Sequence, residues 1–191
     1  MTKWIQTYTG KKIDPFYPDP KQIEILDIAH ALSQTCRFSG HTDLFYSVAE
    51  HCFNLSYLVK SEFAIYGLLH DAAEAYLNDV VRPVKPFARF HYDGLILTYK
   101  EVEDALLNTI ITKFIGECNF NEQIYEYDDR LTFTEGTILM PDTTCWELQK
   151  NPFKIYLNCW SPLVAERHYL QRFAELIPNM LQVKSIPEKI D

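Results

Sequence analysis

Apolar residues recur at helical spacing along most of this chain, and this periodicity is what most limits the folds open to it. Leu26, Ala29 and Leu32, for example, fall on one face of a helix. The same spacing predicts helices over 23–32, 46–60, 62–77, 87–115, 121–139 and 160–177. No stretch shows the sustained alternation of apolar and polar residues that marks a half-buried strand, so we expect no substantial sheet. The sequence therefore predicts a compact all-α bundle.

Prolines and short polar segments separate the predicted helices. Prolines cannot continue a helix, and their cluster near the start predicts an irregular arm over 1–20. The segment 36–43, CRFSGHTD, is expected to form a loop, and 180–191 a frayed tail. No linker or internal repeat divides the chain, and its length suffices for one sizeable core, so we expect a single domain over 1–191.

The composition excludes several classes of partner. The chain carries 18 basic and 26 acidic residues, a formal net charge of −8, so no broad basic surface is expected for duplex nucleic acid. No apolar run approaches the roughly 18 residues of a membrane helix, and the N-terminal segment lacks the apolar stretch of a secretory signal. Five scattered cysteines without a CxxC pair indicate reduced thiols. These features predict a cytoplasmic protein.

Side chains of the kinds that bind metals fall on successive predicted helices. His51 lies on the second, His70 and Asp71 are adjacent on the third, and Asp128 lies on the fifth. Adjacent residues on a helix point about 100° apart, so His70 and Asp71 would reach a metal at a seam between helices, one from each flank. Two imidazoles and two carboxylates suit a borderline divalent ion such as Zn²⁺, Mn²⁺, Co²⁺ or Fe²⁺, and Mg²⁺ stays an alternative.

Each of these residues also has a less specific explanation. A lone histidine such as His91 or His168 is more often a surface or hydrogen-bonded residue than a ligand. That explanation is weaker for His70 and Asp71, because the surrounding LLHDAAEAY is otherwise mostly Leu, Ala and Tyr. An aspartate in such a setting is costly unless it is paired, hydrogen-bonded or bound to a metal.

The order of these residues, together with CRFSGHTD, YSVAEHC, LLHDAAEAYLNDVVRPVKP and YDDRLTFTE, resembles the HD-domain superfamily of metal-dependent phosphohydrolases. The local motifs are most similar to the branch that holds phage dATP triphosphohydrolases and bacterial 5′-deoxynucleotidases. The resemblance covers residues 20–140. It implies a helical HD bundle with a metal site between its helices, and a phage-encoded enzyme of this kind would act in the host cytoplasm.

The resemblance implies that the two histidines and the two aspartates named above are the metal ligands. Asp129 adjoins Asp128, and we choose Asp128 because the family pattern places an aspartate seven residues before a glutamate, here Glu135. His41 falls in the predicted loop, and we assign it at most to the substrate or to a contact behind the ligands.

The same resemblance implies Glu74 as a catalytic acid or base. Glu74 lies three residues beyond Asp71 and so faces nearly the same way on the predicted helix. A carboxylate there could orient the attacking water or protonate the leaving oxygen. Asp79, at the end of that helix, is a second candidate for this role, and the alternative for Glu74 is a solvated surface position.

Substrate binding is assigned to four residues around the expected site. Arg37 offers a bidentate fork and Lys85 a point charge for phosphate oxygens, with ordinary solvated cations as the alternative. Phe38 can stack on a base or wall off the sugar. The family often has tryptophan at the related position, so Phe38 departs from its pattern. Pro83 is expected to shape the rim of the pocket.

The resemblance implies hydrolysis of a 2′-deoxynucleoside 5′-phosphate, with dNTPs such as dATP ahead of dNMPs. The alternatives are a 5′-deoxynucleotidase, a cyclic-nucleotide or (p)ppGpp hydrolase, and a nucleotide-binding HD module without turnover. The predicted helix 87–115 could support a homo-oligomer, or its apolar face could be core. That helix is expected to turn inward Leu95, Val102, Leu106, Ile110 and Phe114.

Overall fold

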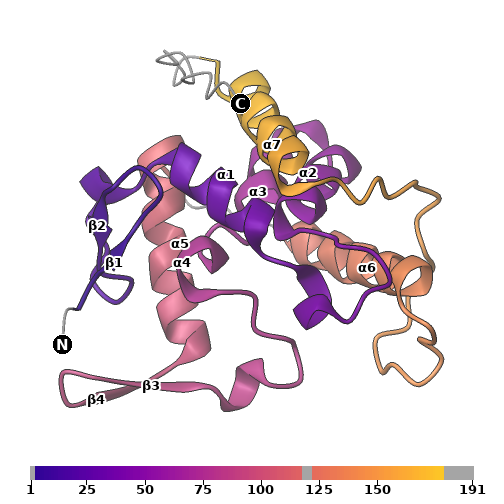
Figure 1. The fold of residues 1–191 in the computed structure, drawn as a ribbon, viewed down its shortest axis with the longest axis horizontal. Helices are drawn as coiled ribbons and strands as arrows, with labels where there is room; N and C mark the ends of the chain where they lie inside the picture. The colour runs from indigo at the N-terminus through magenta and orange to yellow at the C-terminus, as the bar shows by residue number, and fades with distance from the viewer. Residues whose placement is uncertain (1–2, 118–121, 179–191) are drawn as a thin grey trace.

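The computed structural model describes residues 3–117 and 122–178, and over these ranges the chain is compact and mostly helical (Figure 1). The α-helices described are α1 (Ile25–Gln34), α2 (Val48–Leu58), α3 (Ala64–Leu69), α4 (Glu74–Leu77), α5 (Tyr99–Ile115), α6 (Glu122–Leu139) and α7 (Pro162–Leu176). Single 3₁₀ turns are η1 (Pro20–Gln22), η2 (Arg37–Gly40), η3 (Ser61–Phe63) and η4 (Lys85–Phe87). The prediction of a helical chain is confirmed in this coarse form.

Two short antiparallel strand pairs make the all-α prediction wrong in its strict form. The strands are β1 (Ile5–Gln6), β2 (Lys12–Ile13), β3 (Arg89–Tyr92) and β4 (Leu95–Thr98), paired as β1–β2 and β3–β4. Neither pair extends beyond two strands. The helices therefore form most of the core, to which β2 adds Ile13.

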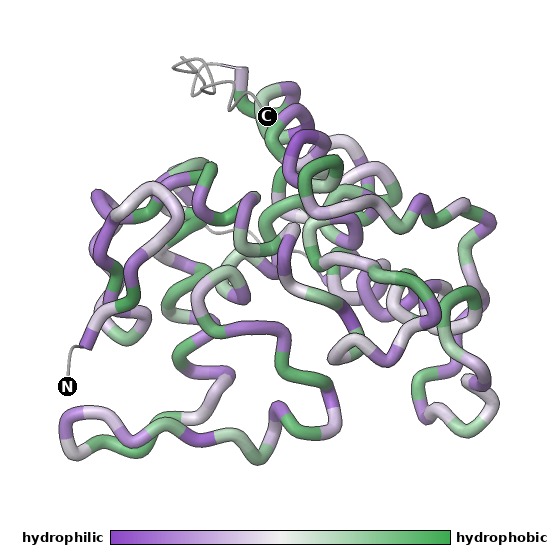
Figure 2. Tube along the Cα trace, viewed as in Figure 1, coloured by the Kyte–Doolittle hydropathy of each residue, from purple (hydrophilic) through white to green (hydrophobic). Residues whose placement is uncertain are grey.

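The core forms where the apolar faces of the helices meet. α2 contacts α1, α3, α6 and α7, and Figure 1 shows α7 lying alongside α2 and α3. Hydrophobic and hydrophilic residues are interspersed along α7 (Figure 2), as expected for a helix that buries one face. Fully buried members of the core include Ile28, Leu32, Leu55, Leu68 and Phe173. Burial of each such side chain contributes about 1.5–3 kcal/mol.

The predicted helix 87–115 is wrong over its first third, which forms the β3–β4 hairpin. Asp93 and Gly94 make the turn with φ values of 48° and 81°, the conformation that an Asp-Gly dipeptide favours in a two-residue hairpin. Thr98 then begins α5 with a capping box, in which its side chain and that of Glu101 each accept the other residue's backbone N–H. Leu95, predicted to face inward, is 52% exposed.

The rest of that predicted helix is α5, and its apolar face belongs to the core. Val102, Leu106, Ile110 and Phe114 are buried as predicted. Three of them, Leu106, Ile110 and Phe114, join the main hydrophobic cluster. Of the two alternatives considered for this face, the structure of the chain favours the core.

The predicted helix 62–77 is interrupted where its metal-binding residue types lie. α3 ends at Leu69, a series of turns follows, and α4 begins only at Glu74. The Gly67 carbonyl, which could accept a bond from the next helical turn, accepts one from Nδ1 of His70 at 2.9 Å. His70 and Asp71 therefore occupy turn positions after α3 and not positions inside a continuous helix.

The N-terminal arm is more ordered than predicted for 1–20. β1 pairs with β2 through the register Ile5 opposite Ile13, and Ile13 is fully buried. The predicted tail 180–191 lies outside the described residues. Within the described ranges, no helix combines the length and apolar composition needed to cross a membrane.

Candidate metal centre

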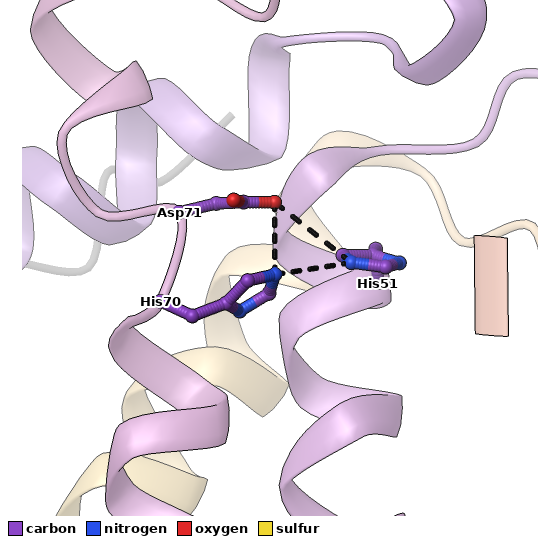
Figure 3. A group of neighbouring side chains, drawn as sticks. All are labelled: His51, His70 and Asp71. Atoms are coloured by element: carbon purple, nitrogen blue, oxygen red, sulfur yellow. Dashed lines mark hydrogen bonds and ion pairs between the residues drawn. The ribbon is translucent and has the colours of Figure 1, made fainter. Parts of the chain in front are cut away.

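Four side chains singled out from the sequence converge between α2, the turns after α3, and α6. The Nε2 atom of His51 lies 3.2 Å from Nε2 of His70 and 3.1 Å from Oδ1 of Asp128. The Oδ2 atom of Asp71 lies 3.1 Å from Nε2 of His70 and 3.8 Å from Nε2 of His51. Figure 3 shows His51, His70 and Asp71 pointing toward one another. We refer to these four residues as the ligand cluster.

Both imidazole rings are held through the nitrogen that faces away from the cluster. Nδ1 of His51 donates to Oε1 of Glu135 at 2.6 Å, and Nδ1 of His70 donates to the Gly67 carbonyl at 2.9 Å. A neutral imidazole has one N–H, so these bonds leave the Nε2 atom of each ring with a lone pair. Two lone pairs 3.2 Å apart repel each other unless a proton or a metal ion lies between them.

The separations match those of ligands around one ion. Atoms that bind a transition metal at about 2.0–2.2 Å lie about 3–4 Å from one another, and the two Nε2 atoms lie 3.1–3.8 Å from each other and from the nearer oxygens of the two carboxylates. Ligand atoms of His51, His70 and Asp71 all lie within 4.8 Å of one another. These three residues could therefore hold a metal ion, and the carboxylate of Asp128 is placed to join them.

The charges around the cluster also favour a cation. Burial disfavours the charged form of His70, but the Asp71 carboxylate outweighs it, and the pKa of His70 is raised well above its ordinary value. Burial would raise the pKa of Asp71, but His70, His51 and Arg37 hold it well below its usual range. A bound divalent ion would bring positive charge to the same carboxylates.

The structure separates the two adjacent aspartates of α6. Oδ1 of Asp128 faces the Nε2 atoms of both histidines, at 3.1 and 3.8 Å. Asp129 instead accepts a hydrogen bond from Nη1 of Arg82 at 2.6 Å. Of the two, Asp128 is the one that lies in the ligand cluster, because consecutive residues on a helix point in different directions.

Arg37 borders the ligand cluster and is buried. Its guanidinium lies 3.6 Å from Oδ2 of Asp71, donates to Oε2 of Glu135 at 3.3 Å, and donates to Thr132 at 2.9 Å. The residue is only 8% exposed, so it is not an ordinary solvated cation. Its Nε is buried and has no hydrogen-bond partner among the described residues.

Glu74 is buried rather than solvated, with 3% exposure. Its Oε1 accepts a bond from Nζ of Lys85 at 3.3 Å, while its Oε2 has no partner among the described residues. Burial, together with the negative charges of Asp71 and Asp79, raises the pKa of Glu74 well above its ordinary value. A buried carboxyl of this kind can carry a proton near neutral pH.

Lys85 and Asp79 lie around Glu74. Lys85 also donates to Oε1 of Glu103 at 2.7 Å, so two carboxylates share its ammonium group. Burial raises the pKa of Asp79, although the nearby Arg37 opposes the shift. The charges of Lys85 and Asp79 therefore act on the same groups as the charges of the ligand cluster.

The remaining predicted substrate residues lie nearer the surface. Phe38 is half-buried beside Arg37, whose guanidinium carbon lies 5.5 Å from the centre of the Phe38 ring. Pro83 and His41 are exposed. The backbone N–H of His41 donates to the Phe38 carbonyl at 3.0 Å, and its side chain is not part of the ligand cluster.

Glu135 lies behind the ligand cluster, and the sequence argument used it only as a landmark. It is fully buried, and its carboxylate accepts bonds from His51, Arg37 and the Tyr46 hydroxyl, the last at 2.8 Å. The available signal was a glutamate four residues from both Leu131 and Leu139, on a helix face that those two residues make apolar.

Glu50 is a second buried acid, and its role is structural. It is fully buried, and it accepts backbone N–H bonds from Asn158, Cys159 and Trp160 at 2.7–3.0 Å. These bonds hold the extended segment before α7 against α2.

Comparison with known proteins adds relatives but no activity. No family model matches the chain. It is 41% identical to the uncharacterized protein YfdR of Escherichia coli and 36% identical to the uncharacterized protein RCAP_rcc00048 of Rhodobacter capsulatus. Each alignment covers 58% of this chain and 58% of the relative. The match therefore spans less than two thirds of either relative.

Proposed function

We propose that this chain is a metal-dependent phosphohydrolase that acts on 2′-deoxynucleoside 5′-phosphates, with dNTPs such as dATP as the leading substrates. The observation that carries the proposal is the ligand cluster, in which two imidazoles are oriented through Nδ1 so that both Nε2 atoms face two carboxylates. A divalent ion held there would polarise a phosphoryl oxygen and acidify water. The resemblance to HD-domain enzymes supports the same reaction class.

The chain's own residues around the cluster suit a phosphate ester. The guanidinium of Arg37, whose Nη1 lies 3.6 Å from Oδ2 of Asp71, can donate to a phosphate oxygen there. The partnerless Oε2 of Glu74 can hold a proton for the leaving oxygen. Lys85, which is 27% exposed at its side chain, keeps positive charge beside Glu74. None of these three roles needs a solvent-exposed residue distant from the ligand cluster.

A substrate panel tests the proposal and separates it from its alternatives. Purified protein is assayed with dNTPs, dNMPs and NTPs in the presence of Mn²⁺, Co²⁺, Zn²⁺ or Mg²⁺, and the released phosphates are identified. We expect deoxynucleoside and tripolyphosphate from dATP. Orthophosphate released from dNMPs alone would instead assign a 5′-deoxynucleotidase.

A matched pair of variants gives this assay its control. His70→Ala removes a member of the ligand cluster, whereas His91→Ala removes an exposed histidine of β3. Turnover should be lost only in the first. If nucleotides bind but no substrate in the panel turns over, the chain is a binding module and the proposed reaction is wrong.

A further inference from the structure

The backbone around Phe38 is held in a conformation that its side chains do not favour. Phe38 and Ser39 have φ values of 53° and 52°, in the left-handed region that bulky residues rarely adopt. Such positions cost about 1–3 kcal/mol each and persist only where surrounding contacts enforce them. Gly40 continues the run at 76°. Contacts from outside this turn therefore hold the Phe38 ring in place.

Trp146, a residue to which the sequence argument gave no role, packs against that ring. The two ring centres lie 5.9 Å apart with an angle of 40° between the ring planes, within the range of favourable aromatic pairs. Trp146 comes from the segment between α6 and α7, far from Phe38 in sequence. The pair forms one aromatic surface next to Arg37, which itself contacts the ligand cluster.

The Trp146 ring packs directly against Gly136 of α6. A Cβ atom at position 136 would lie 2.5 and 2.6 Å from two atoms of that ring, far inside van der Waals contact. Any other residue at this position would displace Trp146. A glycine inside a helix costs about 1 kcal/mol relative to alanine, so the close approach of the ring accounts for a residue that otherwise weakens α6.

Hydrogen bonds hold the segment that carries Trp146. The backbone N–H of Trp146 donates to the backbone carbonyl of Thr143 at 3.1 Å. The side-chain amide of Gln149 donates to the Thr143 carbonyl at 3.0 Å and to the Trp146 carbonyl at 2.8 Å. The indole is thus presented by a closed turn, and it remains partly exposed to solvent.

We propose that Trp146, paired with Phe38, is a specificity-determining residue that stacks on the planar base of the substrate. The inference deepens the proposed function, on which its choice of a nucleotide base rests. Arg37 lies between this aromatic surface and the ligand cluster, so a phosphate at the cluster and a base on the rings can belong to one molecule. Stacking on aromatic side chains is tolerant of base identity, so the pair selects for a base and discriminates less between bases.

Intrinsic fluorescence with a ligand that cannot be hydrolysed tests the inference directly. The probe is 2′-deoxyadenosine, and the control ligand is 2-deoxyribose 5-phosphate, which lacks a base. Wild-type protein should lose fluorescence on binding 2′-deoxyadenosine only. Trp146→Phe should abolish this quenching, whereas Trp4→Phe, at an exposed tryptophan near β1, should keep it. Quenching that survives Trp146→Phe, or wild-type protein that does not bind 2′-deoxyadenosine, overturns the inference.

Calorimetry with two further variants separates stacking from folding. Trp146→Ala should bind 2′-deoxyadenosine about 5- to 150-fold more weakly, the range for loss of one stacked base. Gly136→Ala keeps the indole but displaces it, so it should weaken binding in the same direction. Metal content should stay at the wild-type value in both. Wild-type affinity in Trp146→Ala overturns the inference.

Binding of the free nucleoside does not depend on turnover, so the two proposals can fail separately. Trp146-dependent binding in a protein that hydrolyses no nucleotide keeps this inference and removes the proposed function. Hydrolysis of dATP that Trp146→Ala leaves unchanged keeps the proposed function and removes this inference.

Discussion

Glu135 determines how His51 meets the ligand cluster. Its fully buried carboxylate accepts the Nδ1–H of His51 at 2.6 Å and so directs Nε2 toward His70 and Asp128. A carboxylate behind a histidine ligand fixes the tautomer and raises the basicity of the ligating nitrogen. Arg37 and Tyr46 donate to the same carboxylate, so its oxygens are hydrogen-bonded although the group is fully buried.

Glu135→Gln should therefore weaken metal binding by about 10- to 100-fold, the usual effect of losing such a partner. The amide keeps the size of the side chain but lacks the negative charge. Titration calorimetry with Zn²⁺ or Mn²⁺ measures the change. Glu166→Gln is the matched control, because Glu166 bonds Nδ1 of His30 at 2.9 Å outside the ligand cluster. Equal losses in the two variants would contradict the role given to Glu135.

Glu74→Gln should keep the metal and lose turnover by about 10²- to 10⁴-fold, the typical effect of losing a general acid or base. Glu74 is buried beside Lys85 but is not a member of the ligand cluster. Elemental analysis and kcat measurements on the same preparation check both parts. Glu62→Gln, at an exposed position of η3, is the control for loss of a charge. Full activity in Glu74→Gln would show that the carboxyl is structural.

Arg37→Ala should lower kcat/KM for all nucleotides by a similar factor. A hydrogen bond to a charged group contributes roughly 1.5–3 kcal/mol, about one to two decades in rate. Arg37 lies beside the phosphate end of the proposed site and makes no contact that would distinguish one base from another. Measurements with dATP, ATP, dGTP and dAMP test this uniformity. A loss confined to one base would place Arg37 at the wrong end of the substrate.

Among the elements, helices with a long apolar face were predictable and the breaks between them were not. α2 and α6 begin and end within two residues of their predicted bounds 46–60 and 121–139. Their apolar faces fix their place in the core, so the periodicity that predicts them also reflects their burial. The breaks depend on turn residues, caps and hydrogen bonds to distant segments, and periodicity does not record these.

The two missed breaks differ in kind. The β3–β4 hairpin carried its own signals, the Asp93-Gly94 turn and the capping pair of Thr98 and Glu101, which the apolar spacing of 87–115 obscured. The end of α3 at Leu69 had no such local signal. It depends on tertiary contacts, among them the bond from the Tyr169 hydroxyl to the Leu68 carbonyl at 2.9 Å. The four residues of the cluster were found by residue type, whereas the break that places His70 and Asp71 in turns was not.

The capping box at α5 gives a prediction at the scale of the element. Thr98→Ala removes the side chain that accepts the Glu101 N–H, and loss of such a cap costs about 0.5–2 kcal/mol. Urea unfolding should show this decrease in the free energy of unfolding. Thr109→Ala is the control, because the Thr109 hydroxyl bonds only its own helix at Ala105. A decrease in Thr109→Ala as large as in Thr98→Ala would argue against the cap.

At the scale of the whole molecule, the ligand cluster ties together segments that are distant in sequence. His51 on α2 and Asp128 on α6 are separated by the whole of α3, α4 and α5, and Asp71 lies between them on a turn. In the unfolded chain these groups are far apart and do not form one site. A bound ion therefore stabilises the folded state and hardly stabilises the unfolded one. The excess of carboxylates around the cluster adds to this, because they repel one another without a cation.

Metal binding should therefore raise the thermal stability of the whole chain. A ligand present at 100 times its dissociation constant stabilises by about 2.7 kcal/mol, and for a protein of this size about 1 kcal/mol shifts Tm by roughly 2–4 °C. Protein stripped with a chelator should gain about 5–11 °C when Zn²⁺ or Mn²⁺ is restored.

His70→Ala should lose both the bound metal and this gain, because its Nε2 lies within 3.8 Å of three other ligand atoms. His91→Ala, which removes an exposed histidine of β3, should keep both. Calorimetric scans and elemental analysis of the three proteins measure the two quantities. Unchanged metal content in His70→Ala would show that the ion binds elsewhere.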